Sequence, residues 1–108
     1  MMATRKVLTL VFVFNGEKVL LGLKKRGFGC GKWNGFGGKV EPGETVRQAA
    51  VRELVEESGA VVKPEDLEDV GRIDFEFKGD PCILEVHAFR TETYSGTLFY
   101  LFWFTREV

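Results

Sequence analysis

The sequence contains little cysteine, histidine or proline. Its 108 residues include two cysteines, one histidine and three prolines. Cys30 and Cys82 have no metal-ligand spacing and no secretory leader pattern accompanies them, so we expect reduced thiols and no disulfide framework. The single histidine, His87, has no Cys, His or Ser partner at a recognisable catalytic spacing. A structural role for His87 is therefore favoured over a catalytic one.

The sequence also lacks a long hydrophobic run and a strong charge of either sign. Its longest apolar run, residues 98–104, has seven residues, which is far fewer than a membrane-spanning helix needs. The net charge of −1 provides no field that would draw the chain to nucleic acid. We therefore expect no membrane association, no nucleic-acid binding and a cytoplasmic location.

The residues that are present are typical of a globular protein. The chain is 44% hydrophobic and 13% aromatic, which argues against a disordered chain. A length of 108 residues suits one domain with a modest core. We expect residues 1–108 to form a single domain.

Two apolar stretches near the N-terminus predict a β-hairpin. Residues 6–14 and 18–23 are rich in β-branched and aromatic residues, and the dipeptide Asn15-Gly16 between them is typical of a type I′ turn. Alternation along the first stretch places Thr9 on an apolar face with Val7, Val11 and Val13. A hydroxyl on such a face is either a satisfied core threonine or a ligand contact, and the pattern alone favours the core.

Two further strands and an apolar tail follow. Residues 70–77 alternate between apolar and acidic side chains, which predicts a half-buried strand with Ile73, Phe75 and Phe77 on its buried face. Residues 83–89 predict another strand after a turn. Residues 98–104 fit either a central strand buried on both faces or an exposed segment prone to aggregation.

Residues 46–58 predict a helix with a defined start and end. Thr45 and Gln48 match a capping box, and Gly59 stands where a left-handed residue is needed. At about 100° per residue, one apolar stripe contains Val46, Ala50 and Leu54, and is widened by Val51 and Val55.

Three glutamates crowd one edge of this stripe. Glu53, Glu56 and Glu57 fall within an arc of about 100° that borders the core. Like charges at this spacing cost roughly 0.2–0.5 kcal/mol per pair, so a cation should offset them. Arg52 can hold Glu56 in a fork but cannot serve all three acids. Mg²⁺, with Mn²⁺ as an alternative, can, because such ions prefer oxygen ligands. An ordinary charged helix with surface ion pairs is the competing interpretation.

A basic cluster and a glycine-rich loop precede the helix. Residues 24–26 carry three cations, which suit a polyphosphate, although a solubilising strand edge gives the same pattern. Gly35, Gly37 and Gly38 let the backbone approach another group closely, and a carbonyl there can serve as a metal ligand.

Residues 38–60, here called the signature segment, resemble the signature of the Nudix hydrolases. The pattern is Gly38, five residues, Glu44, seven residues, Arg52-Glu53-Leu54, one residue, Glu56-Glu57, one residue and Gly59. Every polar and glycine position matches, and Ala60 stands where a larger aliphatic residue is usual. The resemblance implies an α/β (α+β) Nudix fold, a mixed β-sheet packed on the signature helix, and hydrolysis of a nucleoside diphosphate linked to another group.

The resemblance also assigns roles to individual residues. It extends over about residues 4–96 to the branch of animal MutT homologues, which clear oxidised purine nucleoside triphosphates. It implies magnesium binding by Gly37, Glu53, Glu56 and Glu57. It implies nucleotide contacts by Thr9, Lys24, Asn34, Phe36, Gly37, Gly38 and Lys39, and a base pocket lined by Phe75 and Leu84. For catalysis we expect Glu56 or Glu57 to activate water, with Arg52 fixing the carboxylate geometry.

Three hypotheses for function remain open. The first is Mg²⁺-dependent hydrolysis of 8-oxo-dGTP or 2-hydroxy-dATP to monophosphate and pyrophosphate by a monomer, in the cytoplasm or in nuclear or mitochondrial pools. The second is a shortened form that binds nucleotide and metal weakly or misfolds, since the resemblance ends at about residue 96 and the family's second helix is expected to be missing. The third is an enzyme for another substrate, such as a dinucleoside polyphosphate or an undamaged triphosphate.

Overall fold

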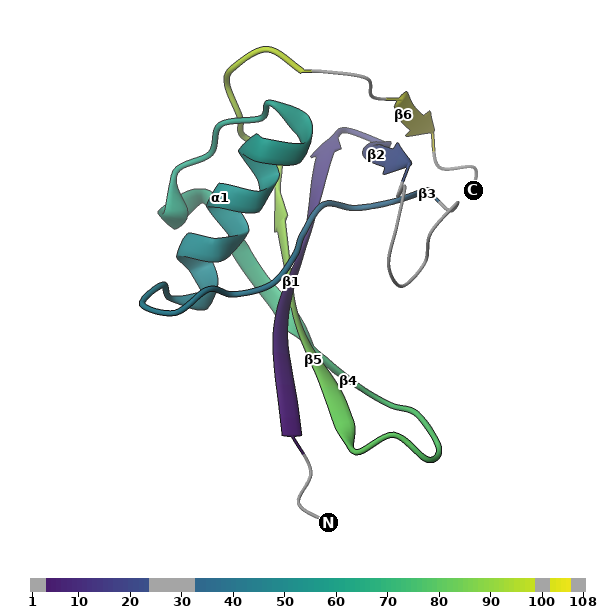
Figure 1. The fold of residues 1–108 in the computed structure, drawn as a ribbon. Helices are drawn as coiled ribbons and strands as arrows, with labels where there is room; N and C mark the ends of the chain where they lie inside the picture. The colour runs from purple at the N-terminus through teal and green to yellow at the C-terminus, as the bar shows by residue number, and fades with distance from the viewer. Residues whose placement is uncertain (1–3, 24–32, 99–101, 106–108) are drawn as a thin grey trace.

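The chain forms a twisted mixed β-sheet with one α-helix against part of one face (Figure 1). The structure is a computed structural model that describes residues 4–23, 33–98 and 102–105. The strand order is β3-β2-β1-β5-β4, and β6 also pairs with β2. The elements are β1 (Thr4–Asn15), β2 (Lys18–Leu23), β3 (Trp33–Asn34), α1 (Val46–Ser58), the 3₁₀ helix η1 (Pro64–Asp66), β4 (Glu68–Glu76), β5 (Cys82–Thr91) and β6 (Phe102–Thr105).

β1 and β5 form the parallel centre of the sheet. Ten residue pairs, from Thr4 with Cys82 to Val13 with Thr91, hold the two strands together. β4 pairs antiparallel with β5, and β2 pairs antiparallel with the end of β1. Parallel neighbours need a long connection, and α1 lies within that connection. The expected α/β (α+β) class, a mixed sheet packed on the signature helix, is confirmed.

The β1–β2 hairpin is confirmed, but its turn differs from the one expected. Asn15 pairs with Lys18, so the two central residues are Gly16 and Glu17. Gly16 has a φ of 60°, and no described non-glycine residue has a positive φ. A type I′ turn needs a positive φ at both central positions, so the prediction of that turn is wrong. A positive φ at the first central position alone, occupied by a glycine, is the pattern of a type II′ turn.

The boundaries of α1 agree with the capping signals. The Thr45 side chain accepts a hydrogen bond from the Gln48 backbone, the reciprocal bond is also formed, and Gly59 ends the helix with a φ of 82°. The buried positions are Ala49, Ala50, Leu54 and Ser58. Val55, which was expected to widen the buried stripe, is 36% exposed. It lies too far around the helix from Ala49 to reach the sheet.

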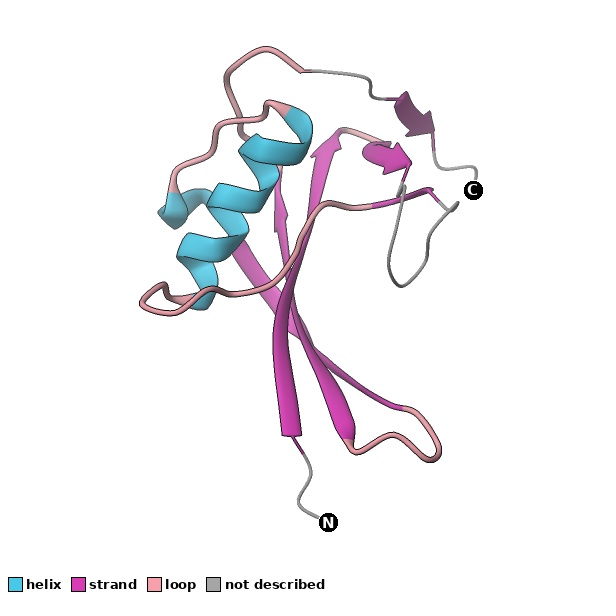
Figure 2. Cartoon of the chain, in the orientation of Figure 1, coloured by secondary structure: helices cyan, strands magenta, loops and turns pink. Residues whose placement is uncertain are grey.

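The hydrophobic core lies between α1 and one face of the sheet. Figure 2 shows α1 beside the half of the sheet that lies away from the β4–β5 turn. Val11 of β1 and Leu54 of α1 are fully buried, and Phe89 of β5 is 3% exposed. Val11 pairs with Phe89, so both project from the same face. Burial of each such side chain contributes about 1.5–3 kcal/mol.

The other face of the sheet carries an apolar row, which we call the open face. It consists of Leu8, Ile73, Phe75, Leu84 and Val86, which the strand registers place together. These positions alternate with those that face α1, so their side chains project away from the helix. Ile73 is 49% exposed and Phe77 is 41% exposed. The prediction that they are buried is therefore wrong, because α1 covers the opposite face and no other described helix covers this one.

Part of the apolar tail is a strand. β6 pairs antiparallel with β2, from Phe102 with Leu21 to Thr105 with Lys18. This agrees with a strand interpretation for Phe102–Thr105, whereas the remaining tail residues 99–101 lie outside the described residues, as do Lys24 and Cys30. Across the described ranges, no helix is long and apolar enough to span a membrane.

Leu54 and its neighbour Val55 provide a matched test of the packing. Leu54→Ala is expected to lower the free energy of unfolding by about 2–4 kcal/mol, because it opens a cavity under α1. Val55→Ala is expected to cost less than about 1 kcal/mol, since this side chain is partly in water. Urea unfolding followed by circular dichroism measures both values. Equal losses would contradict the described orientation of α1.

Candidate functional site

The glycine loop, residues 35–40, lies antiparallel along β1. Thr9 N donates to Gly38 O at 2.8 Å, and Val40 N donates to Val7 O at 3.0 Å. A Cβ atom placed on Gly37 would lie 1.8 Å from Thr9 O. Any side chain at Gly37 would therefore push the loop away from the strand, since real Cβ atoms do not approach oxygen so closely. The close approach that the glycines allow is to β1 itself.

The acidic edge of α1 rests on this loop. Gly37 N donates to Glu57 Oε1 at 2.9 Å. A Cβ on Gly38 would lie 2.6 to 2.8 Å from the carboxyl group of Glu53. Two of the three glutamates thus contact two consecutive glycines. Thr9, 4% exposed, accepts from Gly38 N and donates to Gly38 O through its hydroxyl, both at 3.3 Å.

Arg52 links the start of the signature segment to its acidic edge. Its Nε and Nη2 donate to the two carboxylate oxygens of Glu44 at 2.9 and 2.7 Å. Its Nη1 donates to Glu53 at 2.8 Å and to Glu56 at 3.3 Å, and its Nη2 also donates to Lys39 O. The fork was expected to hold Glu56, but it holds Glu44. Glu44, just before the helix, accepts from two Arg52 donors, whereas Glu56 accepts from one.

This arrangement fixes two ionisation states. The Arg52 hydrogen bond, followed by the Glu41 backbone, lowers the pKa of Glu44 from 4.5 to about 2. The Glu44 hydrogen bond in turn raises the pKa of Arg52 above its ordinary value. Glu44 is therefore an anion at any physiological pH. Its negative charge offsets part of the positive charge of Arg52, which leaves less of that charge for Glu53 and Glu56. The side chain of Glu56 is 56% exposed and has the longer contact with Arg52.

The chemistry of the acidic edge suits a hard divalent ion. Glu53, Glu56 and Glu57 lie within about one turn of helix and offer carboxylate oxygens beside Gly37, which is the donor type that Mg²⁺ prefers. In the described conformation, no three His, Cys, Asp or Glu side chains of the described residues form a metal-binding group. Glu53 and Glu57 instead accept hydrogen bonds from Arg52 and from Gly37. Metal binding at this edge stays a prediction that requires these carboxylates to turn toward a shared ion.

The other residues that were predicted to contact the nucleotide lie in different parts of the structure. Asn34 is in β3, where it pairs with Gly22 of β2, and its Oδ1 accepts a hydrogen bond from Gly35 N at 2.8 Å. Phe36 is 3% exposed and belongs to the core, and its backbone N and O pair with Val11. Phe75 and Leu84 pair on the open face, whereas Thr9 projects from the face that α1 covers. Lys24 lies outside the described residues.

Sequence reasoning assigned no role to Glu44 and left His87 as structural. The helix spacing rules do not reach Glu44, because it precedes α1, and only its match to the family pattern could have marked it. His87 Nε2 lies 2.7 Å from Glu85 Oε2, and Glu85 also pairs with Arg5 at 3.1 Å. This network of polar side chains on β1 and β5 agrees with a structural role for His87.

Comparison with known proteins gives a consistent result. Residues 4–108 match the NUDIX domain family. An oxidized purine nucleoside triphosphate hydrolase of Danio rerio is 58% identical over 95 residues, which cover 88% of this chain and 60% of the relative. The protein of the same name from Mus musculus is 53% identical over 96 residues, covering 89% and 60%. The chain therefore spans about 60% of the length of these curated relatives.

Solved structures share the fold. A MutT NUDIX hydrolase from Burkholderia pseudomallei has a TM-score of 0.83 at 23% identity, covering 94% of this chain and 84% of its own. The E. coli ORF135 protein has a TM-score of 0.74 at 29% identity, covering 95% and 75%. The first of these likenesses concerns the fold alone.

The depressed pKa of Glu44 predicts a pH-dependent stability. A group whose pKa is lowered on folding stabilises the protein above its unfolded pKa, here 4.5, and this contribution is lost as the pH falls toward 2. Glu44→Gln should therefore lower the melting temperature by several degrees at pH 7, and the difference from the unaltered chain should shrink between about pH 4.5 and pH 3. Thermal melts over this range measure it.

Glu65→Gln is the control, since it removes the same charge from an exposed position on η1. Its melting temperature should stay close to that of the unaltered chain throughout. A Glu44→Gln difference that remains constant from pH 7 to pH 3 would show that the ion pair with Arg52 is not its source.

Proposed function

Because the chain belongs to the Nudix family of hydrolases, we propose that it hydrolyses oxidised purine nucleoside triphosphates, such as 8-oxo-dGTP and 2-hydroxy-dATP, to the monophosphate and pyrophosphate. The observation that carries the proposal is the seating of Glu53 and Glu57 on Gly37 and Gly38. The names of relatives that are 58% and 53% identical support this substrate class. The proposed active form is a monomer.

Members of this family generally use divalent metal ions, and here we propose Mg²⁺. Glu53, Glu56 and Glu57 would hold it, with Gly37 as an additional oxygen donor. When bound, such an ion neutralises phosphate charge and lowers the pKa of an attacking water. Arg52 would keep the carboxylates in position through its contacts with Glu53 and Glu56.

Side chains of α1 and of the glycine loop would activate the water and stabilise the phosphates. Glu56 or Glu57 would orient the attacking water or take its proton. The exposure of Glu56 favours this role, because a carboxylate that is 56% exposed can reach both water and substrate. Lys39, exposed at the end of the glycine loop, would stabilise negative charge that develops on the phosphates.

A second candidate function is nucleotide binding without turnover. It is supported by the open face, where Phe75 and Leu84, the residues expected to line the base pocket, have no covering helix among the described residues.

A third candidate function is hydrolysis of a nucleoside triphosphate that carries a different base. It is supported by a CTP pyrophosphohydrolase of Escherichia coli (strain K12) that is 42% identical over 69 residues, 64% of this chain and 48% of that relative.

The purified chain should release nucleoside monophosphate from 8-oxo-dGTP when Mg²⁺ is present and should stop when EDTA is added. Hydrolysis of dGTP and CTP should be slower, if the sheet alone discriminates the base. Chromatography of the products measures all three rates. Faster release from dGTP or CTP would favour the third candidate, and binding without release by a chain that melts cooperatively would favour the second.

Substitutions on the acidic edge separate catalysis from folding. Glu56→Gln and Glu57→Gln should each lower kcat by about 10²–10⁴-fold, because the water loses its proton acceptor or its orientation. Glu68→Gln on β4 is the matched control, since that side chain is 65% exposed and forms an ion pair with Arg90 at 3.3 Å. Unchanged turnover in Glu57→Gln would remove that residue from the mechanism, provided its melt matches that of the control.

A further inference from the structure

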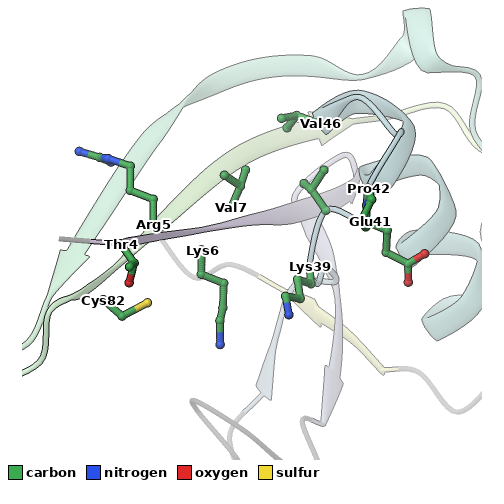
Figure 3. A pocket seen from close by; sticks show the side chains of 10 residues that line it. Thr4, Arg5, Lys6, Val7, Lys39, Glu41, Pro42, Val46 and Cys82 are labelled. Carbon is green, nitrogen blue, oxygen red and sulfur yellow. The ribbon is translucent and has the colours of Figure 1, made fainter. Parts of the chain in front are cut away.

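A groove runs along the part of β1 that the glycine loop does not cover. It has a volume of about 650 Å³, which lies within the roughly 300–1,000 Å³ usual for small-molecule sites. β1 lines it with residues 4–7, and the loop lines it with residues 39–42; Val46 and Cys82 complete it. Neither the acidic edge nor the core belongs to this groove. Figure 3 shows it from close by.

Two lysines line the groove, and both lie on the same face of the sheet. Lys39 forms a bridge with Leu8 of β1, so both side chains lie on one face, and Lys6 lies two residues earlier on that face. Diagonal neighbours of this kind have backbones about 7–8 Å apart, which two lysine side chains can span to reach one anion. Figure 3 shows Lys6 and Lys39 extending to the same side of β1, while Arg5 extends to the other.

These two cations lack the anionic partners that Arg5 has. Arg5 pairs with Asp74 at 3.2 Å and with Glu85 at 3.1 Å. Within the described residues, neither Lys6 nor Lys39 has a carboxylate within 4.0 Å. Glu41 lines the same groove, but its nearest cation is Arg52 at 3.9 Å. Two lysines in one groove therefore leave positive charge that a bound anion can neutralise.

The strand register connects Lys6 to the open face. Lys6 pairs with Leu84 on β5, and Leu84 pairs with Phe75 on β4. The three side chains form one row across three strands, with the cation at the end nearest the glycine loop. An apolar wall that ends in a cation next to the loop is complementary to a base followed by its phosphates.

We propose that Lys6 is a further substrate-binding residue, which contacts the phosphate chain of the nucleoside triphosphate together with Lys39. This inference rests on the proposed function, because it assumes that the nucleotide lies between the open face and the glycine loop. Its consequence is selectivity by phosphate number: two lysines attract the larger negative charge of a triphosphate more strongly than the charge of a monophosphate.

Equilibrium binding tests the proposal without requiring turnover. Dissociation constants for 8-oxo-dGTP and 8-oxo-dGMP are measured by calorimetry in EDTA. Lys6→Ala should weaken 8-oxo-dGTP binding by about two- to fivefold, the range for one exposed charge pair. Lys6→Glu should weaken it further, and Lys6→Arg should restore it. The affinity for 8-oxo-dGMP should change by a smaller factor, since a monophosphate carries less negative charge than a triphosphate.

Lys63→Ala is the matched control, because this lysine is exposed beside η1 and lies outside the groove. It should leave both dissociation constants unchanged. Equal weakening of the two ligands by Lys6→Glu, or no weakening of either, would overturn the proposal. If the unaltered chain binds neither ligand, both the proposed function and the Lys6 proposal are wrong. If it binds both ligands but releases no monophosphate with Mg²⁺, only the proposed hydrolysis is wrong, and the Lys6 variants still test the role of Lys6 in binding.

Substitution of Glu41 distinguishes phosphate contact by Lys6 from simple charge balance within the groove. If Lys6 acts only by balancing the Glu41 charge, its effect on 8-oxo-dGTP binding should disappear in a Glu41→Gln background. If Lys6 contacts phosphate, Lys6→Ala should weaken binding by a similar factor in both backgrounds, and Glu41→Gln alone should strengthen it by removing a repelling charge. Melting curves of each variant establish that the fold is retained.

Discussion

The site depends on contact between two backbones. The glycine loop lies so close to β1 that no side chain fits at Gly37, and this contact sets the distance between the loop and the strand. α1 follows the loop after a short turn, so the position of its acidic edge is fixed by the same contact. The hydrogen bond from Gly37 N to Glu57 then joins the loop back to the helix. Strand, loop and helix thereby form one closed unit.

Arg52 adds an electrostatic constraint to this unit. Its fork to Glu44 connects the residue before α1 to the middle of the helix, and its other contacts reach Glu53 and Glu56. A guanidinium group suits this task because its donors are rigid and it stays charged. The repulsion among the glutamates is thus partly offset by the protein itself, while the Glu56 side chain, 56% exposed, stays far more accessible than that of Glu53, which is 17% exposed.

Local features of the sequence predicted local structure well. The capping box, Gly59 and the strand alternation depend on neighbours a few residues away, and the helix, the hairpin and most strand limits follow from them. Partners at long range were not accessible in this way. Alternation reveals that β4 has two faces but not which one the helix covers, so Ile73 and Phe77 were placed inside. The helix spacing rule predicted Glu56 as the carboxylate that Arg52 holds in a fork. In the structure the chain turns back before the helix and places Glu44 against Arg52 instead. The groove beside Lys6 exists only once β1 meets the loop.

The parallel pairing of β1 with β5 also governs how the chain can fold. Arg5 and Glu85, which form an ion pair, are 80 positions apart, and the two central strands cannot join until the whole segment between them is available. Folds dominated by such distant pairings close slowly, because the entropy of closing the chain is lost before the contacts are gained. During synthesis, the edge of β1 that pairs with β5 therefore stays unpaired until Cys82–Thr91 has been made. The strand that supports the site is the first to be made and among the last to be secured.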